Sequence, residues 1–298
     1  MRKVAVVLTL ALAVAFAAFW FVTAPEQAGA TVSEGAPDLD NGRTVFFAGG
    51  CASCHATPDQ PDRTLLGGGH ALASPVGNFV APNISPDLQH GIGAWTQEQF
   101  ASALLKGVSP RGRHYYPAFP YTAYQHMKSE DVRDLFAFIQ TLPATGQTNP
   151  GHDFPLDLAI VRRGMGLWKL INFRGEPYDD PAADPQLVRG RYLVEALGHC
   201  GECHSPRDIT GAVAEDRLYA GGKLPDGDSV PNITPGKGGI GEWTQEDLVF
   251  FFEDGTTPEG DVTGGEMASV IANTSQLPEA DRQAMAAYLK SLPAREAP

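Results

Sequence analysis

The sequence predicts an all-α fold with two similar domains in tandem, preceded by an N-terminal apolar helix. Three observations support this prediction: an apolar run opens the chain, one short cysteine motif occurs twice, and the segments after the two motifs resemble each other. A repeat period far above about 50 residues indicates duplicated domains. The predicted boundaries are 1–24 for a signal anchor or signal peptide, 25–40 for a linker, 41–143 for domain 1, 144–185 for a connector, 186–293 for domain 2 and 294–298 for a tail.

The N-terminal segment has the pattern of an export signal. The basic pair Arg2-Lys3 precedes a nearly continuous apolar run from Val4 to Val22. This run approaches the roughly 20 residues that span a bilayer, and Trp20 suits a membrane interface. We favour an uncleaved anchor in the bacterial inner membrane; cleavage at 28–30 would instead give a soluble periplasmic protein. In both cases the rest of the chain lies on the periplasmic side.

The composition describes a soluble, loop-rich body. The 33 glycines and 24 prolines are typical of loops that wrap a bound group. The formal net charge of −13 argues against a nucleic-acid-binding protein, which needs cationic side chains to neutralise phosphates. An acidic surface either steers a basic partner or keeps an exported protein soluble.

Two C-x-x-C-H motifs, at 51–55 and 200–204, indicate the chemistry, and they contain all four cysteines of the chain. Two thiols on one helical turn can form thioethers with the vinyl groups of one porphyrin, and the adjacent histidine then ligates iron. Zinc-binding or redox C-x-x-C sites are the alternative, but the repeated histidine favours two covalently bound haem c groups. The predicted attachment residues are Cys51, Cys54, Cys200 and Cys203, and the predicted iron ligands are His55 and His204.

The segments after the motifs repeat at the same distance from each histidine. P-N-I-S-P at 82–86 matches P-N-I-T-P at 231–235, and G-I-G-A-W-T at 91–96 matches G-I-G-E-W-T at 239–244. Equal spacing implies one fold used twice. Two interpretations of the shared Asn and Trp residues are open: haem contacts, or held turns and packed rings. We predict haem contacts for Asn83, Asn232, Trp95 and Trp243.

Each domain is expected to have roughly three short helices around its haem. A Gly-Arg pair is predicted to open the helix before each motif, at Gly42 and Gly190. About 100 residues make a small core, and a buried haem would supply much of the missing apolar area. The middle and last helices are predicted from their N-terminal signals, at Thr96, Thr244, Ser129 and Pro278.

The connector contains an apolar and basic stretch from Leu156 to Phe173. Such a helix could lie on a membrane or grip a partner. We favour a different interpretation, because Gly164 and Gly166 weaken an isolated surface helix. In it, the apolar side chains pack between the two domains: Ile160, Leu167, Trp168 and Ile171.

Together with the segment G-R-H-Y-Y-P-A-F-P-Y at 112–121, these motifs resemble the membrane-associated cytochrome c subunits of periplasmic alcohol, aldehyde, sugar and sugar-acid dehydrogenases. The resemblance covers residues 40–293 and implies two class-I-like cytochrome c domains. It further implies electron transfer from a dehydrogenase catalytic subunit to a downstream cytochrome, a terminal oxidase or quinone. Many such subunits carry three haems. This chain has motifs for two, which suggests the dihaem branch, some members of which accompany molybdenum-containing aldehyde or N-heterocycle dehydrogenases.

The sixth iron ligands are expected among the methionines, because carriers of this kind generally pair His with Met, which raises the potential. Met267, in a predicted loop before the last helix, is the candidate for the second haem. For the first haem, the family often has methionine in a Y-P-A-M-P-Y segment, but this chain has Phe119 there. The nearest methionine is Met127, just before the last helix of the domain, and it is the candidate. The rivals of Met127 are His126 and His114.

The alternative function is a dihaem enzyme of the peroxidase or thiosulfate-oxidising type, with an open or labile site at the first haem. A cysteine ligand there is excluded because haem attachment uses every cysteine. The missing methionine at position 119 keeps an open first haem in consideration. We favour an electron carrier that is not itself an enzyme. No role is assigned to His70, His90, His152 and His199.

Overall fold

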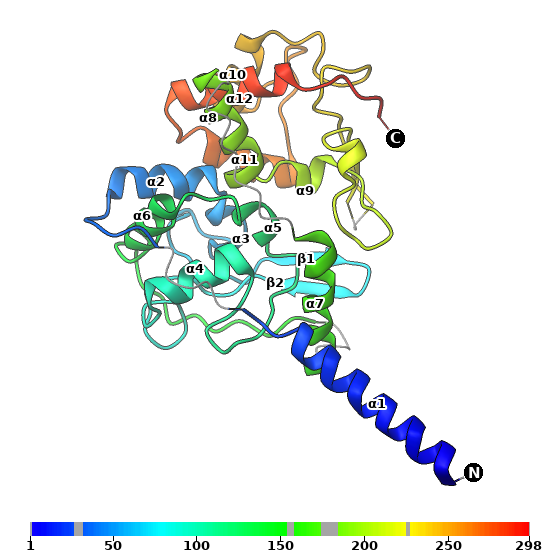
Figure 1. Ribbon diagram of the computed structural model, residues 1–298. Helices are drawn as coiled ribbons and strands as arrows, with labels where there is room; N and C mark the ends of the chain where they lie inside the picture. Colours follow the sequence, from blue (N-terminus) through cyan, green and yellow to red (C-terminus); the bar gives the residue numbers. More distant parts are fainter. Residues whose placement is uncertain (1, 27–31, 154–157, 174–183, 225–226, 298) are drawn as a thin grey trace.

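The computed structural model describes residues 2–26, 32–153, 158–173, 184–224 and 227–297. Its fold is mostly helical, as predicted. In Figure 1 the second domain lies above the first, and a single long helix projects from the first domain. The two chain halves therefore form two adjacent helical units behind an isolated N-terminal helix.

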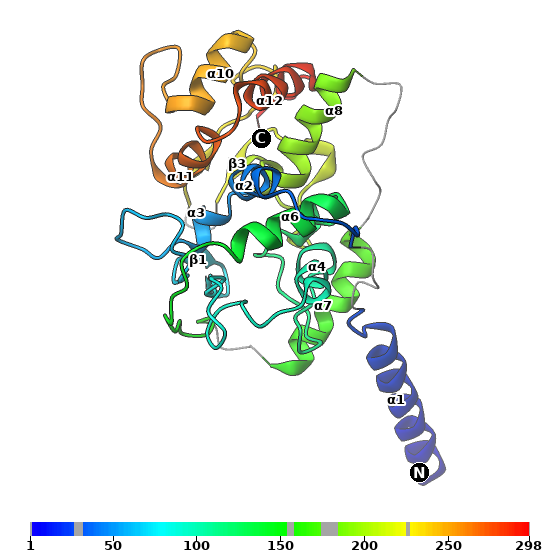
Figure 2. The same cartoon turned by 90° about the vertical axis from the view of Figure 1, so that its left-hand side faces the viewer.

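The projecting helix is α1 (Arg2–Val22), and Figure 2 shows it extending away from the body along its whole length. Its mean hydropathy is 2.5, and none of its apolar window is buried. Among the described residues, it is the one helix long and apolar enough to cross a membrane, a test that signal sequences also pass. The proposed cleavage region, 28–30, lies outside the described residues.

The first domain has five helices and one antiparallel hairpin. Its middle helix begins, as predicted, at Thr96, which forms a reciprocal capping box with Gln99. The last helix begins at Ser129, but its N-cap is Lys128, whose side chain makes no capping bond. The elements are α2 (Leu39–Ala48), α3 (Cys51–His55), β1 (Ala71–Ser74), β2 (Gly77–Val80), α4 (Gln97–Lys106), α5 (Tyr121–Tyr124) and α6 (Ser129–Ile139).

The second domain repeats this order. Thr244 forms the matching capping box, here with Asp247. Its first helix continues into a π-helical segment before the haem motif. The elements are α8 (Pro185–Arg191), η1 (Tyr192–Leu197), α9 (Gly201–His204), η2 (Glu215–Arg217), β3 (Gly222–Lys223), β4 (Ser229–Val230), α10 (Gln245–Asp254), α11 (Gly265–Thr274) and α12 (Glu279–Ser291).

One glycine in each domain allows two helices to cross closely. A Cβ on Gly42 would lie 2.2 Å from the carbonyl oxygen of Asp134, and a Cβ on Gly190 would lie 2.0 Å from that of Ala284. The prediction that Gly-Arg opens these helices is wrong, because α2 begins at Leu39 and α8 at Pro185. The glycines instead lie inside the helices, where α2 crosses α6 and α8 crosses α12.

The connector forms helix α7 (Ala159–Asn172), and the prediction that its apolar residues pack between the domains is largely wrong. Ile160, Leu167 and Ile171 are 45%, 49% and 57% exposed. The side of α7 that faces the body instead contains Gly166 and Lys169. Trp168 is half-buried, and its indole N–H donates to the carbonyl oxygen of Thr210 at 3.0 Å. Residues 154–157 and 174–183 lie outside the described residues.

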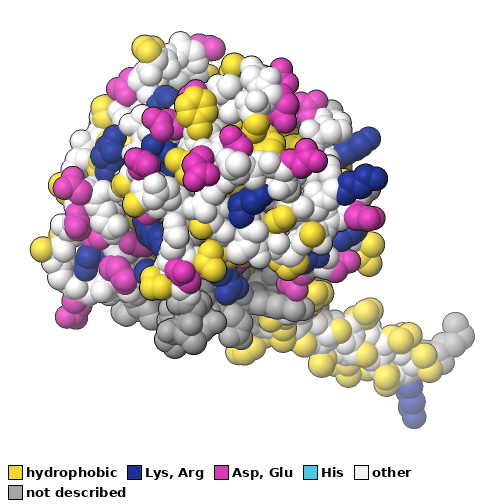
Figure 3. Space-filling view, turned by 90° about the horizontal axis from the view of Figure 1, so that it is seen from above, with side chains coloured by type: hydrophobic (Ala, Val, Ile, Leu, Met, Phe, Trp, Pro, Cys, Tyr) yellow, Lys and Arg dark blue, Asp and Glu magenta, His cyan; other side chains and the backbone are white. Residues whose placement is uncertain are grey.

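The two domains share a continuous core. Tyr192 from η1 is 4% exposed and donates a hydrogen bond to Asp131 of α6 at 2.5 Å. The backbone N–H of Lys128 donates to the same hydroxyl at 3.1 Å. The outer face seen in Figure 3 carries Asp and Glu side chains interspersed with Lys and Arg, whereas apolar side chains dominate α1.

Candidate haem sites

Each haem motif lies on a short helix that ends at its histidine. Cys51 and Cys54 are one turn apart on α3, and the Nδ1–H of His55 donates to the carbonyl oxygen of Pro82 at 2.8 Å. His204 donates in the same way to Pro231 at 2.9 Å. Because a carbonyl only accepts, each bond fixes the proton on Nδ1 and leaves the Nε2 lone pair for a metal.

Burial supports the neutral form of these imidazoles. It lowers the pKa of His55 and of His204, and the carbonyl bonds oppose that shift only in part. None of the four cysteines forms a disulfide. Two thiols one turn apart, followed by a neutral imidazole with a free Nε2, form the donor set that a thioether-bound haem needs. The residues of both motifs therefore fit haem c.

The P-N-I-[ST]-P loops hold these histidines in place. This contact was not predicted from the sequence. The first residue of each loop supplies the carbonyl that orients each ring. The equal spacing between each histidine and its loop was the available signal. The sequence marked the loop, but the contact depends on backbone that folds back from 27 residues away.

Asn83 and Asn232 hold turns in these loops. The side-chain oxygen of Asn83 accepts from the Ser85 N–H at 2.8 Å, and its amide donates to Thr145 O at 2.7 Å. Asn232 accepts from the Thr234 N–H at 2.8 Å and donates to the carbonyl oxygen of Arg295 at 2.8 Å. Trp95 and Trp243 are half-buried against the core. Contacts of these four residues with haem stay a prediction.

The two motifs lie close together at the domain boundary. The Tyr124 hydroxyl donates to the carbonyl oxygen of Gly49 at 2.8 Å, and its ring centroid lies 5.5 Å from that of His199. The pKa of the Cys54 thiol is raised to about 11 by burial, then by Glu266, and then by Cys203 of the other motif. One tyrosine thus links the residues that precede both haem motifs.

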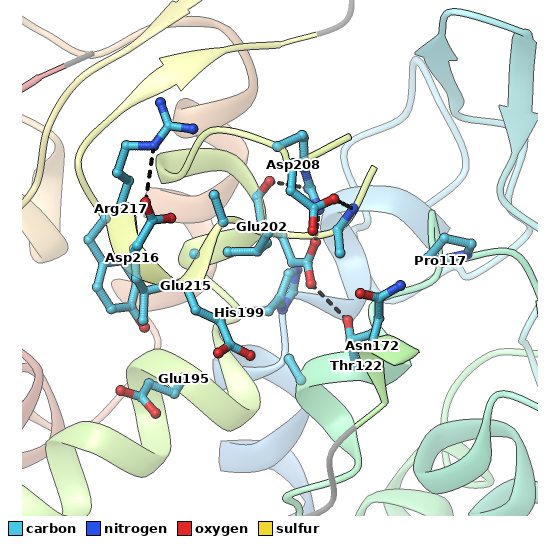
Figure 4. Close-up of a pocket in the computed structure, with 18 of the residues that line it drawn as sticks. Pro117, Thr122, Asn172, Glu195, His199, Glu202, Asp208, Glu215, Asp216 and Arg217 are labelled. Atoms are coloured by element: carbon cyan, nitrogen blue, oxygen red, sulfur yellow. Dashed lines mark hydrogen bonds and ion pairs between the residues drawn. The ribbon is translucent and has the colours of Figure 1, made fainter. Parts of the chain in front are cut away.

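Each domain also contacts the haem motif of the other domain. Ser53 and Glu202 occupy the same place in the two motifs. The Asn273 amide of α11 donates to Ser53 Oγ at 2.7 Å, and the Thr122 hydroxyl of α5 donates to Glu202 Oε1 at 2.8 Å (the latter shown in Figure 4). Figure 1 places α3, α5, α9 and α11 together in the layer between the domains.

A cleft of about 800 Å³ opens beside this layer, lined by residues of both domains (Figure 4). Its wall contains ion pairs, including Arg207 with Glu202 at 2.8 Å. Among the described residues that line it, none is a motif cysteine or a proximal histidine. The cleft therefore belongs to the domain boundary and lies outside the haem donor sets.

The two candidate methionines occupy different kinds of position. Met267 lies in the first turn of α11, so the prediction of a loop at this point is wrong. Helix formation here is consistent with the bond between Asn273 and Ser53, which ties α11 to the first motif. Met127 is 7% exposed and belongs to the core cluster.

The two methionines do not occupy equivalent positions in the two domains. Tyr115 N–H donates to Gly107 O at 2.8 Å, and Thr263 N–H donates to Gly255 O at 3.0 Å, so the two loops are equivalent. Counting forward from them, Met267 corresponds to Phe119. Met127 and Leu277 correspond too, since each directly precedes the N-cap of its domain's last helix.

The two histidines that compete with Met127 as ligands, His114 and His126, lie in different surroundings. His114 is 4% exposed; its Nε2 lies 3.0 Å from the carbonyl oxygen of Thr23, and its Nδ1 lies 3.2 Å from Lys169 Nζ. With both ring nitrogens engaged, His114 is not available to iron. His126 lines the cleft. His199, given no role from the sequence, lies beside Tyr124 with φ of 42° and donates to Leu197 O at 2.9 Å.

These features define a c-type cytochrome with two haem sites. Residues 39–143 match the cytochrome c family. A dihaem c-type cytochrome of Cereibacter sphaeroides is 48% identical over 266 residues, which are 87% of this chain and 87% of the relative. The chain therefore belongs to the dihaem c-type cytochromes related to the cytochrome c subunits of membrane-bound quinone dehydrogenases.

Longer relatives contain the same unit. The fructose dehydrogenase cytochrome subunit of Gluconobacter japonicus is 38% identical over 87% of this chain and 53% of the relative. The cytochrome c subunit of the quinone alcohol dehydrogenase of Gluconobacter oxydans is 34% identical over 86% of this chain and 55% of the relative. This chain thus spans about half of their length. Membership in this group implies electron transfer.

Proposed function

We propose that this cytochrome accepts electrons from a periplasmic dehydrogenase catalytic subunit and passes them through two haems to a downstream cytochrome, a terminal oxidase or quinone. The observation that carries the proposal is the closeness of the two haem motifs at the domain boundary, where Tyr124 links them. Electron transfer between cofactors needs such proximity. Related cytochrome subunits of fructose and alcohol dehydrogenases support a dehydrogenase partner.

The haem would supply the one-electron chemistry, and this chain's residues would hold and orient it. The carbonyl oxygens of Pro82 and Pro231 fix the imidazoles of His55 and His204. Such bonds to a ligating histidine restrict ring rotation and raise its basicity.

Met267 and Met127 are our proposed sixth ligands of the second and first haems. Met267 is supported by its correspondence to Phe119, the position where the family often has the methionine of Y-P-A-M-P-Y. Met127 is supported by its burial and by being the one methionine in residues 41–143. Methionine on both irons would suit a carrier of raised potential.

We also propose that α1 is retained as an anchor on the periplasmic face of the inner membrane. The end of α1 is built into the first domain: Thr23 is 1% exposed and its carbonyl oxygen bonds to His114 at 3.0 Å. The Arg163 guanidinium lies 4.5 Å from the ring centroid of Trp20. Cleavage after this segment would remove both contacts.

Co-purification after mild detergent extraction tests the partnership. We expect a dehydrogenase to accompany the cytochrome, and we expect its substrate to reduce both haems only when that subunit is present. The purified cytochrome alone should show negligible turnover. Oxidation of alcohols, aldehydes or thiosulfate by the cytochrome alone, at about 1–1,000 per second, would contradict the proposal.

A further inference from the structure

Helix α7 presents an apolar stripe away from the protein body. Ile160, Leu167 and Ile171 recur at the helical spacing that places them on one face. The opposite side contains the buried Gly166 and Lys169. The exposed apolar residues of α7 and its N-cap are Leu158 at 54%, Ile160 at 45%, Leu167 at 49%, Leu170 at 62% and Ile171 at 57%.

The stripe is held in this orientation by the contacts of the other side. Lys169 Nζ donates to the carbonyl oxygens of Lys106 at 2.5 Å and Gly107 at 2.9 Å, and it lies 4.4 Å from the ring centroid of Tyr121. The Arg162 guanidinium lies 4.5 Å from the ring centroid of Tyr116. Because these contacts fix the rotation of α7 about its axis, the apolar stripe cannot turn inward.

Helix α7 is joined to α1 where α1 leaves the body. A Cβ on Gly166 would lie 2.6 Å from the carbonyl oxygen of Thr23, so only glycine permits this approach. Arg163 stacks on Trp20 and also donates to its carbonyl oxygen. Figures 1 and 2 both show α7 at the upper end of α1. Helix α7 is therefore held at the end of α1, where a membrane-spanning α1 would leave the bilayer.

The charge of α7 suits the surface of an anionic bilayer, whereas the net charge of the whole chain does not. Residues 158–173 contain no acidic residue, although the whole chain has a net charge of −13. Arg163 is half-exposed next to the apolar stripe, and Arg162 is half-exposed on the side of α7 that faces the body. Interfacial helices combine an apolar face with Arg or Lys, because acyl chains accept the first and anionic headgroups attract the second.

We infer that α7 lies on the outer surface of the bilayer that α1 crosses, with Ile160, Leu167 and Ile171 at the boundary between headgroups and acyl chains. This inference rests on the proposed retention of α1. The chain would then contact the membrane twice. Two contacts fix the orientation of the haem domains toward the membrane, which one flexible anchor would leave free.

Site-directed spin labelling of the full-length holoprotein in nanodiscs containing phosphatidylglycerol tests the inference. Haem attachment consumes the native thiols, so an introduced cysteine carries the only label. The test positions are Leu167→Cys and Ile171→Cys. Leu12→Cys in α1, 71% exposed, serves as the lipid control, and Leu88→Cys in a loop of the first domain, 72% exposed, serves as the aqueous control. Collision with oxygen and with a water-soluble nickel chelate reports the surroundings of each label.

We expect the oxygen-to-nickel collision ratio at positions 167 and 171 to exceed that at position 88 several-fold and to approach that at position 12. A ratio equal to that at position 88 would overturn the inference. So would protection from both reagents, which would mean that protein covers the stripe, either a dehydrogenase subunit or a second copy. An aqueous signal at position 12 as well would instead contradict the retained anchor.

Discussion

The two domains share their haem cradles and differ at the loop after the middle helix. In both, a motif histidine donates to a proline carbonyl, and a glycine permits a close helix crossing. In that loop, however, His114 is 4% exposed and bonds to the end of α1, whereas its counterpart Val262 is 76% exposed. The residues that would hold haem are thus duplicated, while the first domain alone uses this loop to hold the end of α1.

A second difference follows a few residues later. The first domain has the short helix α5, of 4 residues, where the second has α11, of 10 residues. Phe119 packs among aromatic rings, with centroids 5.6 Å from Tyr115 and 5.8 Å from Tyr124. Its counterpart Met267 is half-buried. The segment that would supply the distal iron ligand is therefore where the two copies diverge, and the following experiments probe that divergence.

The largest expected effect is loss of one haem. Because each motif uses its own two thiols, the denatured wild-type protein should retain two covalent haems. Cys200→Ala should reduce or abolish attachment in the second domain alone, and Cys51→Ala should do so in the first. Intact-mass measurement of the denatured variants, with peptide mapping, gives the count. One or three haems in the wild type would contradict the assignment.

The next effect concerns the sixth ligands. Met127→Leu and Met267→Leu should each remove part of the near-infrared sulfur-to-iron band and lower one haem potential, since the substitution keeps side-chain volume but removes the thioether. Met285→Leu is the matched control, because Met285 is 3% exposed in the core of the second domain.

The repeat makes this test discriminating, because Met127 corresponds to the core residue Leu277. If Met127→Leu behaves like the control while Met267→Leu abolishes the whole band, Met127 is a packing residue. The first haem then differs from the second in its distal ligand.

A third experiment tests the part that the domains share. Gly42→Ala and Gly190→Ala should each destabilise the protein by about 2–3 kcal/mol, because the new methyl meets backbone that cannot move without separating two helices. Chemical denaturation of the holoprotein measures the free energy of unfolding. Gly164→Ala in α7 is the control, since a Cβ there meets nothing within 4 Å; it should stabilise by about 1 kcal/mol. A neutral result at Gly190 alone would break the equivalence of the crossings.

The smallest effect is expected at the bonds between domains. Ser53→Ala removes two hydrogen bonds to the other domain, with Asn273 and with the carbonyl oxygen of Ser269, and should cost about 1–2 kcal/mol. Thr122→Val removes the one hydrogen bond to Glu202 and should cost about 1 kcal/mol. Ser275→Ala serves as a control, because its hydroxyl bonds within α11, to Ala272 O at 3.3 Å. Differential scanning calorimetry measures the melting temperatures of the three variants, which should fall for Ser53→Ala and Thr122→Val but not for the control. Equal melting of all three would contradict a contribution of the crossed contacts to stability.

Local patterns predicted much of the fold. Thr96 and Thr244 cap helices through residues three positions away, so the sequence contains the whole interaction. The haem motifs are equally local. The close crossing at Gly42 was missed because it depends on Asp134, and the helical state of Met267 was missed because Gly264 and Gly265 indicate a loop.

The orientation of the connector helix was missed for a related reason. Gly164 and Gly166 weaken an isolated surface helix, so the sequence favoured packing of the apolar residues between the domains. Contacts of Lys169 and Gly166 with distant residues decide which side faces the body. The contact of His199 with Tyr124 was missed for the same reason, because Tyr124 lies in the other half of the chain.

The crossed contacts also say what kind of junction this is. The second domain's α11 contacts the first motif through Ser53, and the first domain's α5 contacts the second motif through the equivalent residue, Glu202. Contacts in which each unit offers the same surface to the other are isologous, as in a two-fold symmetric homodimer. Joining the two units in one chain raises the effective concentration of each unit near the other. The chain is built like a dimer of two cytochromes whose subunits are covalently joined.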